Sequence, residues 1–265
     1  MTMNYFDGVL KTVVYRDYRH EGAIAIAGFP GMGLVGKTVA EYLIRTLNAE
    51  HVASIYYTRF PAHLLVKPDA TAHINRVDIY FAKRNSIPIF IVSSDAQPLH
   101  DADQNALSFY IVSELYKRGV RELIAAAAFV TEPFVEHRRV FVTGTSERIV
   151  NKYVKYGAEP LKEGVITGMN GVIVGWAHVL SIDAVCMLGE TWRSIVELNY
   201  VDYGAAKSIL QVLNAVFDLG LDLRDLDENA KRVEEEVRKL FSYVATPSAR
   251  ERRETDRDRS VYYIT

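Results

Sequence analysis

The sequence has 265 residues, 49% of them hydrophobic and 24% charged, which is enough apolar material to bury one large core and excludes a disordered chain. The formal net charge is −2, from 31 Lys and Arg against 33 Asp and Glu, so no overall field attracts nucleic acid or an anionic membrane. We therefore expect neither nucleic acid nor a membrane as a partner.

The single cysteine and the first residues indicate the compartment. Cys186 lies in the apolar run 184–188, so we expect a buried thiol and no disulfide framework. The opening residues, MTMNYFDGVLK, lack the basic and apolar regions of a signal peptide, and no apolar stretch reaches the roughly 18 residues that span a bilayer. These features predict a cytoplasmic protein.

Short apolar runs alternate with segments of helical period along the first half of the chain. The first run, 23–27, precedes a predicted helix at 35–47 with one apolar face, formed by Val35, Val39, Leu43 and Leu47. The elements that follow are strands at 51–57, 77–82 and 87–93, a helix at 102–118 that ends at Gly119, and a strand at 122–129. This order is that of repeated β-then-α units.

The second half continues the alternation. Its expected elements are a strand at 140–143, a helix capped by Ser146, a strand near Val165, a helix from Asn170 and a strand at 184–188. The runs 89–92 and 123–130 are apolar at every position, as parallel strands covered by helices on both faces require. We therefore predict an α/β fold, a three-layer α/β/α sandwich with a mostly parallel central sheet.

Beyond Gly204 the composition becomes helical. A helix is expected at 205–217, and then a coiled-coil-like stripe with alternating spacings of four and three, formed by Leu226, Ala230, Val233, Val237, Leu240 and Val244. The stripe packs either on its own domain or at a subunit interface. The sequence thus predicts a core at 1–203, a helical C-terminal extension at 204–245 and a mobile charged tail with an apolar end at 246–265.

A glycine-rich turn follows the first strand and matches two phosphate-binding patterns. One is the G-x-G-x-x-G of dinucleotide sites, and the other is G-x-x-x-x-G-K-[ST], in which the lysine reaches the outer phosphates and the hydroxyl holds Mg²⁺. The residues that would bind nucleotide are Gly31, Gly33, Gly36, Lys37 and Thr38. Nucleotide binding is therefore one interpretation of this turn.

The other interpretation of the turn is structural. Glycines permit a sharp bend and close contact between strand and helix, with Lys37 a solvated residue in the first helical turn. A nucleotide triphosphatase also needs an apolar strand that ends in a metal-binding Asp, and Asp95 comes late after its strand. The second half of the nucleotide pattern is therefore only approximate.

Acidic and histidine side chains gather after the strand at 87–93, namely Asp95, His100, Asp101 and Asp103. At the end of a central strand this group could hold a divalent metal or a small ligand. The alternative is that Asp101 or Asp103 caps the following helix. Because the histidines show no pair at zinc-ligand spacing, we assign no metal site and no catalytic residue.

Several segments, in chain order over roughly residues 20–230, resemble the proteasome assembly chaperone 2 family. They are Phe29-Pro30-Gly31-Met32-Gly33-Leu34-Val35-Gly36 with Ala40, Tyr42, Leu43 and Ile44, then Ser94-Asp95-Ala96-Gln97-Pro98, Gly168-Met169-Asn170-Gly171-Val172-Ile173, Glu190-Thr191 and Ala205-Ala206. The resemblance implies a fold similar to the nucleoside phosphorylase and hydrolase sandwich, a homo-oligomer, and non-catalytic chaperoning of proteasome α-subunits without a cofactor. It also implies that the nucleotide pattern is coincidental, because Lys and Thr are not fixed features of that family's turn. A nucleotide-binding protein or NTPase is the alternative.

The tail is the segment that we expect to bind a partner. Residues 250–259 hold five Arg and four acidic residues, and the apolar end that follows is Val261, Tyr262, Tyr263, Ile264 and Thr265. A charged tether with an aromatic end is typical of a segment that becomes ordered on another protein. The resemblance also implies a way of docking, because proteasome activators and some archaeal relatives of this family insert a C-terminal hydrophobic-Tyr-any tripeptide between α-subunits through its terminal carboxylate. Here Tyr263 lies one place too early, so the strict motif is not matched and a shifted contact is left open.

Overall fold

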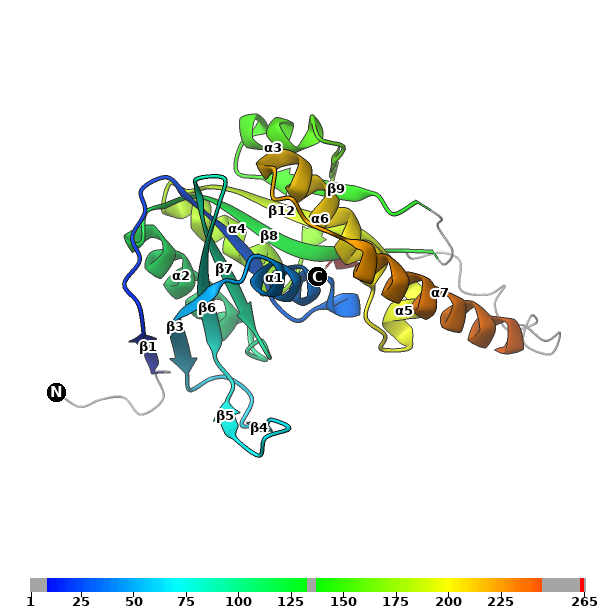
Figure 1. Cartoon of the computed structure of the whole chain (residues 1–265), viewed down its shortest axis with the longest axis horizontal. Coiled ribbons are helices and arrows are strands. Elements are labelled where there is room, and N and C mark those ends of the chain that lie inside the picture. The colour runs from blue at the N-terminus through cyan, green and yellow to red at the C-terminus, as the bar shows by residue number, and fades with distance from the viewer. Residues whose placement is uncertain (1–8, 133–136, 245–262, 265) are drawn as a thin grey trace.

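A nine-stranded sheet forms the centre of the molecule in the computed structural model, which describes residues 9–132, 137–244 and 263–264 (Figure 1). Across the sheet the strands are β1 (Leu10–Val14), β3 (Glu50–Tyr57), β6 (Val77–Arg84), β7 (Ile87–Ser94), β2 (Ala23–Gly28), β8 (Val120–Thr131), β12 (Asp183–Trp192), β9 (Val140–Gly144) and β10 (Glu159–Pro160). The central strands β7, β2, β8 and β12 pair in parallel, whereas β1, β3 and β6 extend the sheet antiparallel on one side. On the other side β9 is antiparallel to β12 and parallel to β10.

Helices cover both faces of this sheet, which confirms the α/β/α sandwich. One face carries α1 (Val35–Thr46), α3 (Glu147–Val154) and α6 (Tyr203–Phe217), and the other carries α2 (Asp101–Lys117) and α4 (Met169–Val179). The sheet is mixed rather than purely parallel. Within the sheet, parallel pairing is confined to the centre and to the short β9–β10 pair. Antiparallel pairing begins between β7 and β6, because these two strands form a hairpin through Asn85 and Ser86.

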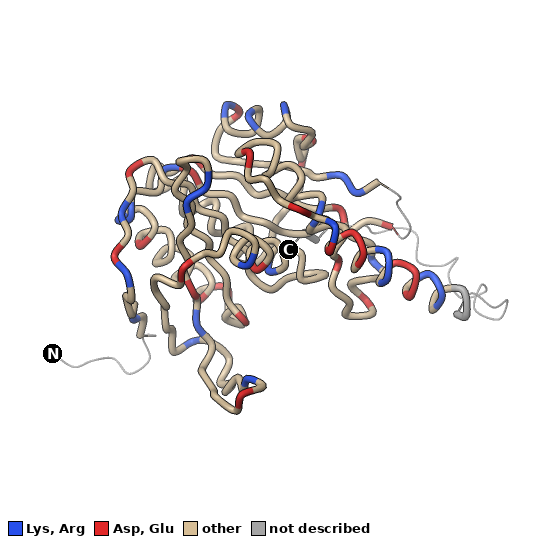
Figure 2. Tube along the Cα trace, in the orientation of Figure 1, with Lys and Arg blue, Asp and Glu red and all other residues tan. Residues whose placement is uncertain are grey.

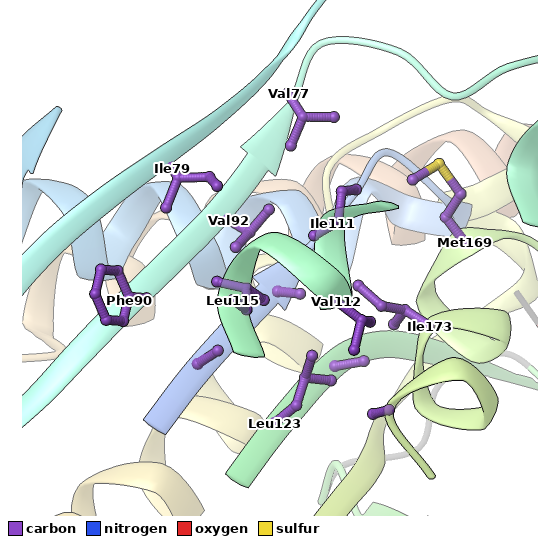
Figure 3. Close-up of a cluster of buried hydrophobic side chains, with 14 of the residues drawn as sticks. Val77, Ile79, Phe90, Val92, Ile111, Val112, Leu115, Leu123, Met169 and Ile173 are labelled. Carbon is purple, nitrogen blue, oxygen red and sulfur yellow. The ribbon is translucent and has the colours of Figure 1, made fainter. Parts of the chain in front are cut away.

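The central strands are apolar through their middle because both of their sides are covered. In β2, Ala25 faces the cluster under α2 and α4, while Ile24 and Ile26 face the cluster under α1 and α6. Figure 3 shows the first of these clusters, where Phe90 and Val92 of β7 meet side chains from α2 and α4. Burying such side chains contributes about 1.5 to 3 kcal/mol each relative to exposure.

Two helix ends follow the sequence rules, and one does not. The N-cap of α3 is Ser146, whose hydroxyl accepts a hydrogen bond from the amide of Ile149. Gly119, with φ of 89°, follows the end of α2. The predicted capping role of Asp101 or Asp103 is wrong, since the cap position of α2 is His100 and both carboxylates lie inside the first turn. There they still face the positive end of the helix dipole.

The remaining elements lie outside the main sheet. β4 (Leu64–Val66) pairs with β5 (Ala72–Ile74) in a small hairpin, and β11 (Val165–Ile166) pairs in parallel with β13 (Tyr263–Ile264). A 3-10 turn, η1 (Met32–Leu34), precedes α1, and α5 (Arg193–Glu197) follows β12. None of the helices described here is long and apolar enough to cross a membrane.

The last helix, α7 (Arg224–Val244), packs part of its apolar stripe on its own chain. Leu226, Ala230, Val233 and Val237 are buried, whereas Leu240 is 40% exposed. The helix contacts α6 and α5, and its end extends beyond the rest of the molecule (Figure 1). The division of the chain at 203 and 245 stays a prediction.

Candidate functional site at the carboxyl edge of the sheet

The carboxyl ends of the parallel strands meet at one edge of the sheet, where open α/β folds bind their ligands. The glycine-rich turn leaves β2 at this edge and enters α1 through η1. Gly33 and Leu34 both have left-handed backbones, with φ of 57° and 49°. A glycine adopts this conformation without cost, whereas at Leu34 it stores strain.

Two glycines of the turn are required by close packing rather than by conformation. A Cβ on Gly28 would overlap the carbonyl oxygen of Gly36, and a Cβ on Gly36 would overlap the carbonyl oxygen of Ala126 in β8. The missing side chains therefore let α1 lie directly against β2 and β8. This contact supports the structural interpretation of the glycine pattern.

Side chains from distant segments bind the backbone of the turn. Asn170, at the start of α4, accepts a hydrogen bond from the Phe29 amide at 2.9 Å and donates one to the Phe29 carbonyl at 3.1 Å. Gln97 donates to the Pro30 carbonyl and accepts from the Met169 amide at 2.8 Å. Three of the segments that carry the family resemblance therefore meet here, and they bond to one another.

Lys37 is held by carboxylates, so the prediction that it is merely a solvated residue is wrong. Its Nζ donates to Asp95 Oδ1 at 2.7 Å and lies 3.5 Å from Glu41 Oε1, and the side chain is only 18% exposed. The other oxygen of Asp95 lies 3.2 Å from Nε2 of His73 on β5. Burial alone would raise the pKa of Asp95, but the hydrogen bonds and charges of Lys37 and His73 outweigh it and lower the pKa.

A groove of about 400 Å³ lies beside this ion pair, between α1 and α7. Lys37 and Thr38 line it from α1, and Asp225 and Asn229 line it from α7. A phosphate bound in the turn would compete with Asp95 for Lys37. In this structure the lysine of the turn is therefore paired with carboxylates of its own chain.

The structure does not bring the predicted acidic cluster together. Asp95 binds Lys37 and His73, whereas Asp103 accepts a hydrogen bond from the hydroxyl of Tyr57 at 2.7 Å. Burial, and then the hydrogen bond to Asp103, raises the pKa of Tyr57 to about 12. Within the described ranges, no three His, Cys, Asp or Glu side chains lie close enough together to hold a metal ion.

A second polar cluster joins the end of β12 to the C-terminal helices, and the sequence analysis missed it. Arg138, only 6% exposed, lies 3.4 Å from Asp202 and 2.9 Å from Glu234, and its guanidinium stacks 4.1 Å from the ring centre of Trp192. Asp202 also caps α6 by accepting from the Ala205 amide at 2.9 Å. No local pattern signals the cluster, because its members come from four separate segments.

The predicted partner-binding tail is described only in part. The backbones of Tyr263 and Ile264 pair with those of Val165 and Ile166. Val261, Tyr262 and Thr265 lie outside the described residues. Cys186 is buried as expected, and burial raises the pKa of its thiol to about 12.

The fold and this edge together define a class, an α/β/α sandwich whose glycine-rich turn is bonded to the start of α4 and to the loop after β7. The model of the PAC2 family matches residues 25–241. This chain therefore belongs to the PAC2 family.

Solved structures and a sequence relative agree with this assignment. The chain is 27% identical to Pyrococcus furiosus PbaB, an archaeal proteasome activator, with a TM-score of 0.80 over 87% of this chain and 98% of that one. It is 26% identical to Pyrococcus furiosus PbaA, an archaeal homolog of proteasome-assembly chaperone, with a TM-score of 0.72 over 91% and 94% of the two chains. The uncharacterized protein MJ1210 of Methanocaldococcus jannaschii is 26% identical over 84% of both chains.

Proposed function

We propose that this protein is a cytoplasmic, non-catalytic, proteasome-assembly-chaperone-like protein that binds proteasome α-subunits as a homo-oligomer. The observation that carries the proposal is the family match over residues 25–241, together with the similarity to PbaB and PbaA along nearly their whole lengths. Those two proteins are a proteasome activator and a homolog of proteasome-assembly chaperone, respectively.

The chemistry of the carboxyl edge supports binding rather than catalysis. Asn170 and Gln97 bond to the backbone of the turn, and Lys37 is neutralised by Asp95 and Glu41. Lys37 lines the groove between α1 and α7, but its charge is paired with that of Asp95. We therefore assign no catalytic residue at this edge.

The tail is the proposed contact with the α-subunits, and this contact requires Tyr263 and Ile264 to leave their pairing with Val165 and Ile166. Its proposed binding residues are Val261, Tyr262, Tyr263, Ile264 and Thr265. The charged segment 250–259 acts as a tether, and the aromatic end supplies apolar area for a groove on the partner. In a homo-oligomer several tails act together, so weak individual contacts gain affinity through effective concentration.

The experiment compares the capture of purified proteasome α-subunits by the full-length protein and by a truncated variant that ends at Ala249. A third protein keeps the full length but carries Tyr262→Ser, Tyr263→Ser and Ile264→Ser, which separates the effect of the apolar end from that of the tether. We expect strong capture by the full-length protein alone. Equal and negligible capture by all three would contradict the proposed function, and equal strong capture would contradict the role of the tail.

A further inference from the structure

The outer surface of the helix pair α2 and α4 carries apolar side chains that none of the described segments covers. We define the α2–α4 face by six residues, Ala102, Ala106, Phe109, Val172, Trp176 and Val179. Phe109 is 42% exposed and Val179 is 62% exposed. The rings of Phe109 and Trp176 meet edge to face at 5.2 Å between centroids, so the stripes of the two helices form one continuous surface.

None of the six residues that define this face is charged, and Asp101 and Asp103 border it only at Ala102 in the first turn of α2. The charged residues of α2 lie in its first turn, at Asp101 and Asp103, and near its end, at Glu114 and Lys117. α4 reads MNGVIVGWAHV and contains no Asp, Glu, Lys or Arg. By contrast, acidic and basic residues follow one another along α7 from Arg224 to Lys239, as Figure 2 shows.

The size and composition of the face are those of an interaction site. The 17-residue α2 is about 25 Å long, the 11-residue α4 is about 16 Å long, and each is about 10 Å wide, which gives a footprint of about 400 Å². The largest apolar patch on a typical monomer is about 300 to 600 Å² and is often functional. Tryptophan and phenylalanine are enriched at interfaces, and Trp176 is already oriented by a hydrogen bond from its Nε1 to Asn105 at 3.1 Å.

We propose that the α2–α4 face is the surface on which a second copy of this chain packs, related by a two-fold axis close to Phe109 and Trp176. This inference rests on the self-association in the proposed function and names its surface. In a two-fold contact the same patch lies on both partners, so a charged face would place like charges opposite one another. An uncharged face meets its own copy without that repulsion.

The absence of charge also favours a second copy of this chain over a different protein that is recognised by its charge. A helix face that recognises a differently charged protein carries the complementary charges, which steer association and exclude other partners. The α2–α4 face offers only shape and apolar area. Packing against itself would bury Phe109, Trp176 and Val179 of both copies in one aromatic cluster.

Sedimentation velocity tests the surface with the full chain. The disruptive variant is Phe109→Glu with Val179→Glu, and the control is Val66→Glu, which places a charge on an exposed apolar residue of the β4–β5 hairpin. We expect an oligomer for wild type and for the control, and a 29.9 kDa monomer for the double variant with unchanged circular dichroism. A monomeric wild type, or an oligomer that the double variant leaves intact, would overturn the proposal.

Tryptophan fluorescence gives an independent measurement that needs no charged substitution. The chain has two tryptophans, and Trp192 is fully buried, so a change on dissociation reports Trp176. We expect the emission of the wild type to shift to longer wavelength as the oligomer dissociates on dilution. Trp176→Phe should remove that shift. An emission shift that persists in Trp176→Phe, or no shift while the wild type dissociates, would contradict packing through the α2–α4 face.

Capture of α-subunits by the same variants separates this proposal from the proposed function. If the double variant is monomeric while wild type and control capture α-subunits, both proposals stand. If the double variant is monomeric and no protein captures α-subunits, the function fails and the surface stands. If capture is strong but the double variant stays oligomeric, the surface fails and the function stands.

Discussion

The carboxyl edge of the sheet and the α2–α4 face differ in what their side chains bond to. At the edge, Asn170, Gln97 and Asp95 join the glycine-rich turn to distant parts of the same chain. On the α2–α4 face, Phe109 and Val179 remain exposed. The segments that carry the family resemblance therefore hold the fold together, whereas the surface of α2 and α4 carries no motif.

The largest effect should come from filling the contact between α1 and β8. In Gly36→Ala the new Cβ collides with the backbone of Ala126, which cannot move aside as a side chain can, so we expect a loss of more than about 3 kcal/mol in the free energy of unfolding. The control is Gly175→Ala in α4, where open space surrounds the new methyl and the helix gains up to about 1 kcal/mol. Chemical denaturation measures both. A free energy of unfolding for Gly36→Ala equal to that of wild type would contradict the structural account of the turn.

A smaller loss should follow removal of the amide that holds the turn. Asn170 is 2% exposed, so Asn170→Ala leaves the Phe29 amide and carbonyl buried without these partners and costs about 2 kcal/mol. Asn151→Ala, on the exposed side of α3, should change the free energy of unfolding little. If both variants melt at the wild-type temperature, the edge is not the structural junction described here.

The dependence of stability on pH tests a largely buried carboxylate on β6, outside both of these regions. Burial alone would raise the pKa of Asp78, but hydrogen bonds from His51, Ser54 and Arg76 lower it below the ordinary value of 3.8. The ionised form therefore stabilises the folded state above that pH, and this contribution is lost as the pH falls through the folded-state value. We expect Asp78→Asn to melt lower than wild type at neutral pH and to lose less stability between neutral and acidic pH. Parallel melting curves would contradict this.

The smallest expected effect concerns nucleotide. ATP with Mg²⁺ raises the melting temperature of a protein that binds it, by mass action. We expect no rise for wild type, and for Lys37→Ala a loss below about 1 kcal/mol because Asp95 is substantially exposed and its charge is screened. A rise in wild type that Lys37→Ala abolishes would favour the NTPase alternative at Gly31, Gly33, Gly36, Lys37 and Thr38.

The fold could be predicted because burial leaves a direct trace in the sequence. β8 is apolar through its centre since both of its sides are covered, and Ser146 caps α3 as its hydroxyl predicts. The antiparallel part of the sheet was missed although a signal was present. The runs at 77–82 and 87–93 are too close in sequence for the crossover that parallel strands need, and Asn85 and Ser86 form the hairpin turn.

The candidate site could be predicted only where its residues are close in sequence. The glycine pattern was visible, but its meaning depends on Asp95 and Asn170, which lie 58 and 141 residues from the atoms that they bond. Arg138 and Glu234 meet across 96 residues. Such pairs are set by the packing of α4, α6 and α7 on the sheet, and a single sequence carries no local trace of them.

The most direct test of the central claim is sedimentation of the full-length protein mixed with purified proteasome α-subunits, with and without ATP and Mg²⁺. The account predicts a complex that sediments faster than either component and does not respond to nucleotide. Separate sedimentation of the two proteins under both conditions, or a complex that forms only with ATP, would contradict it.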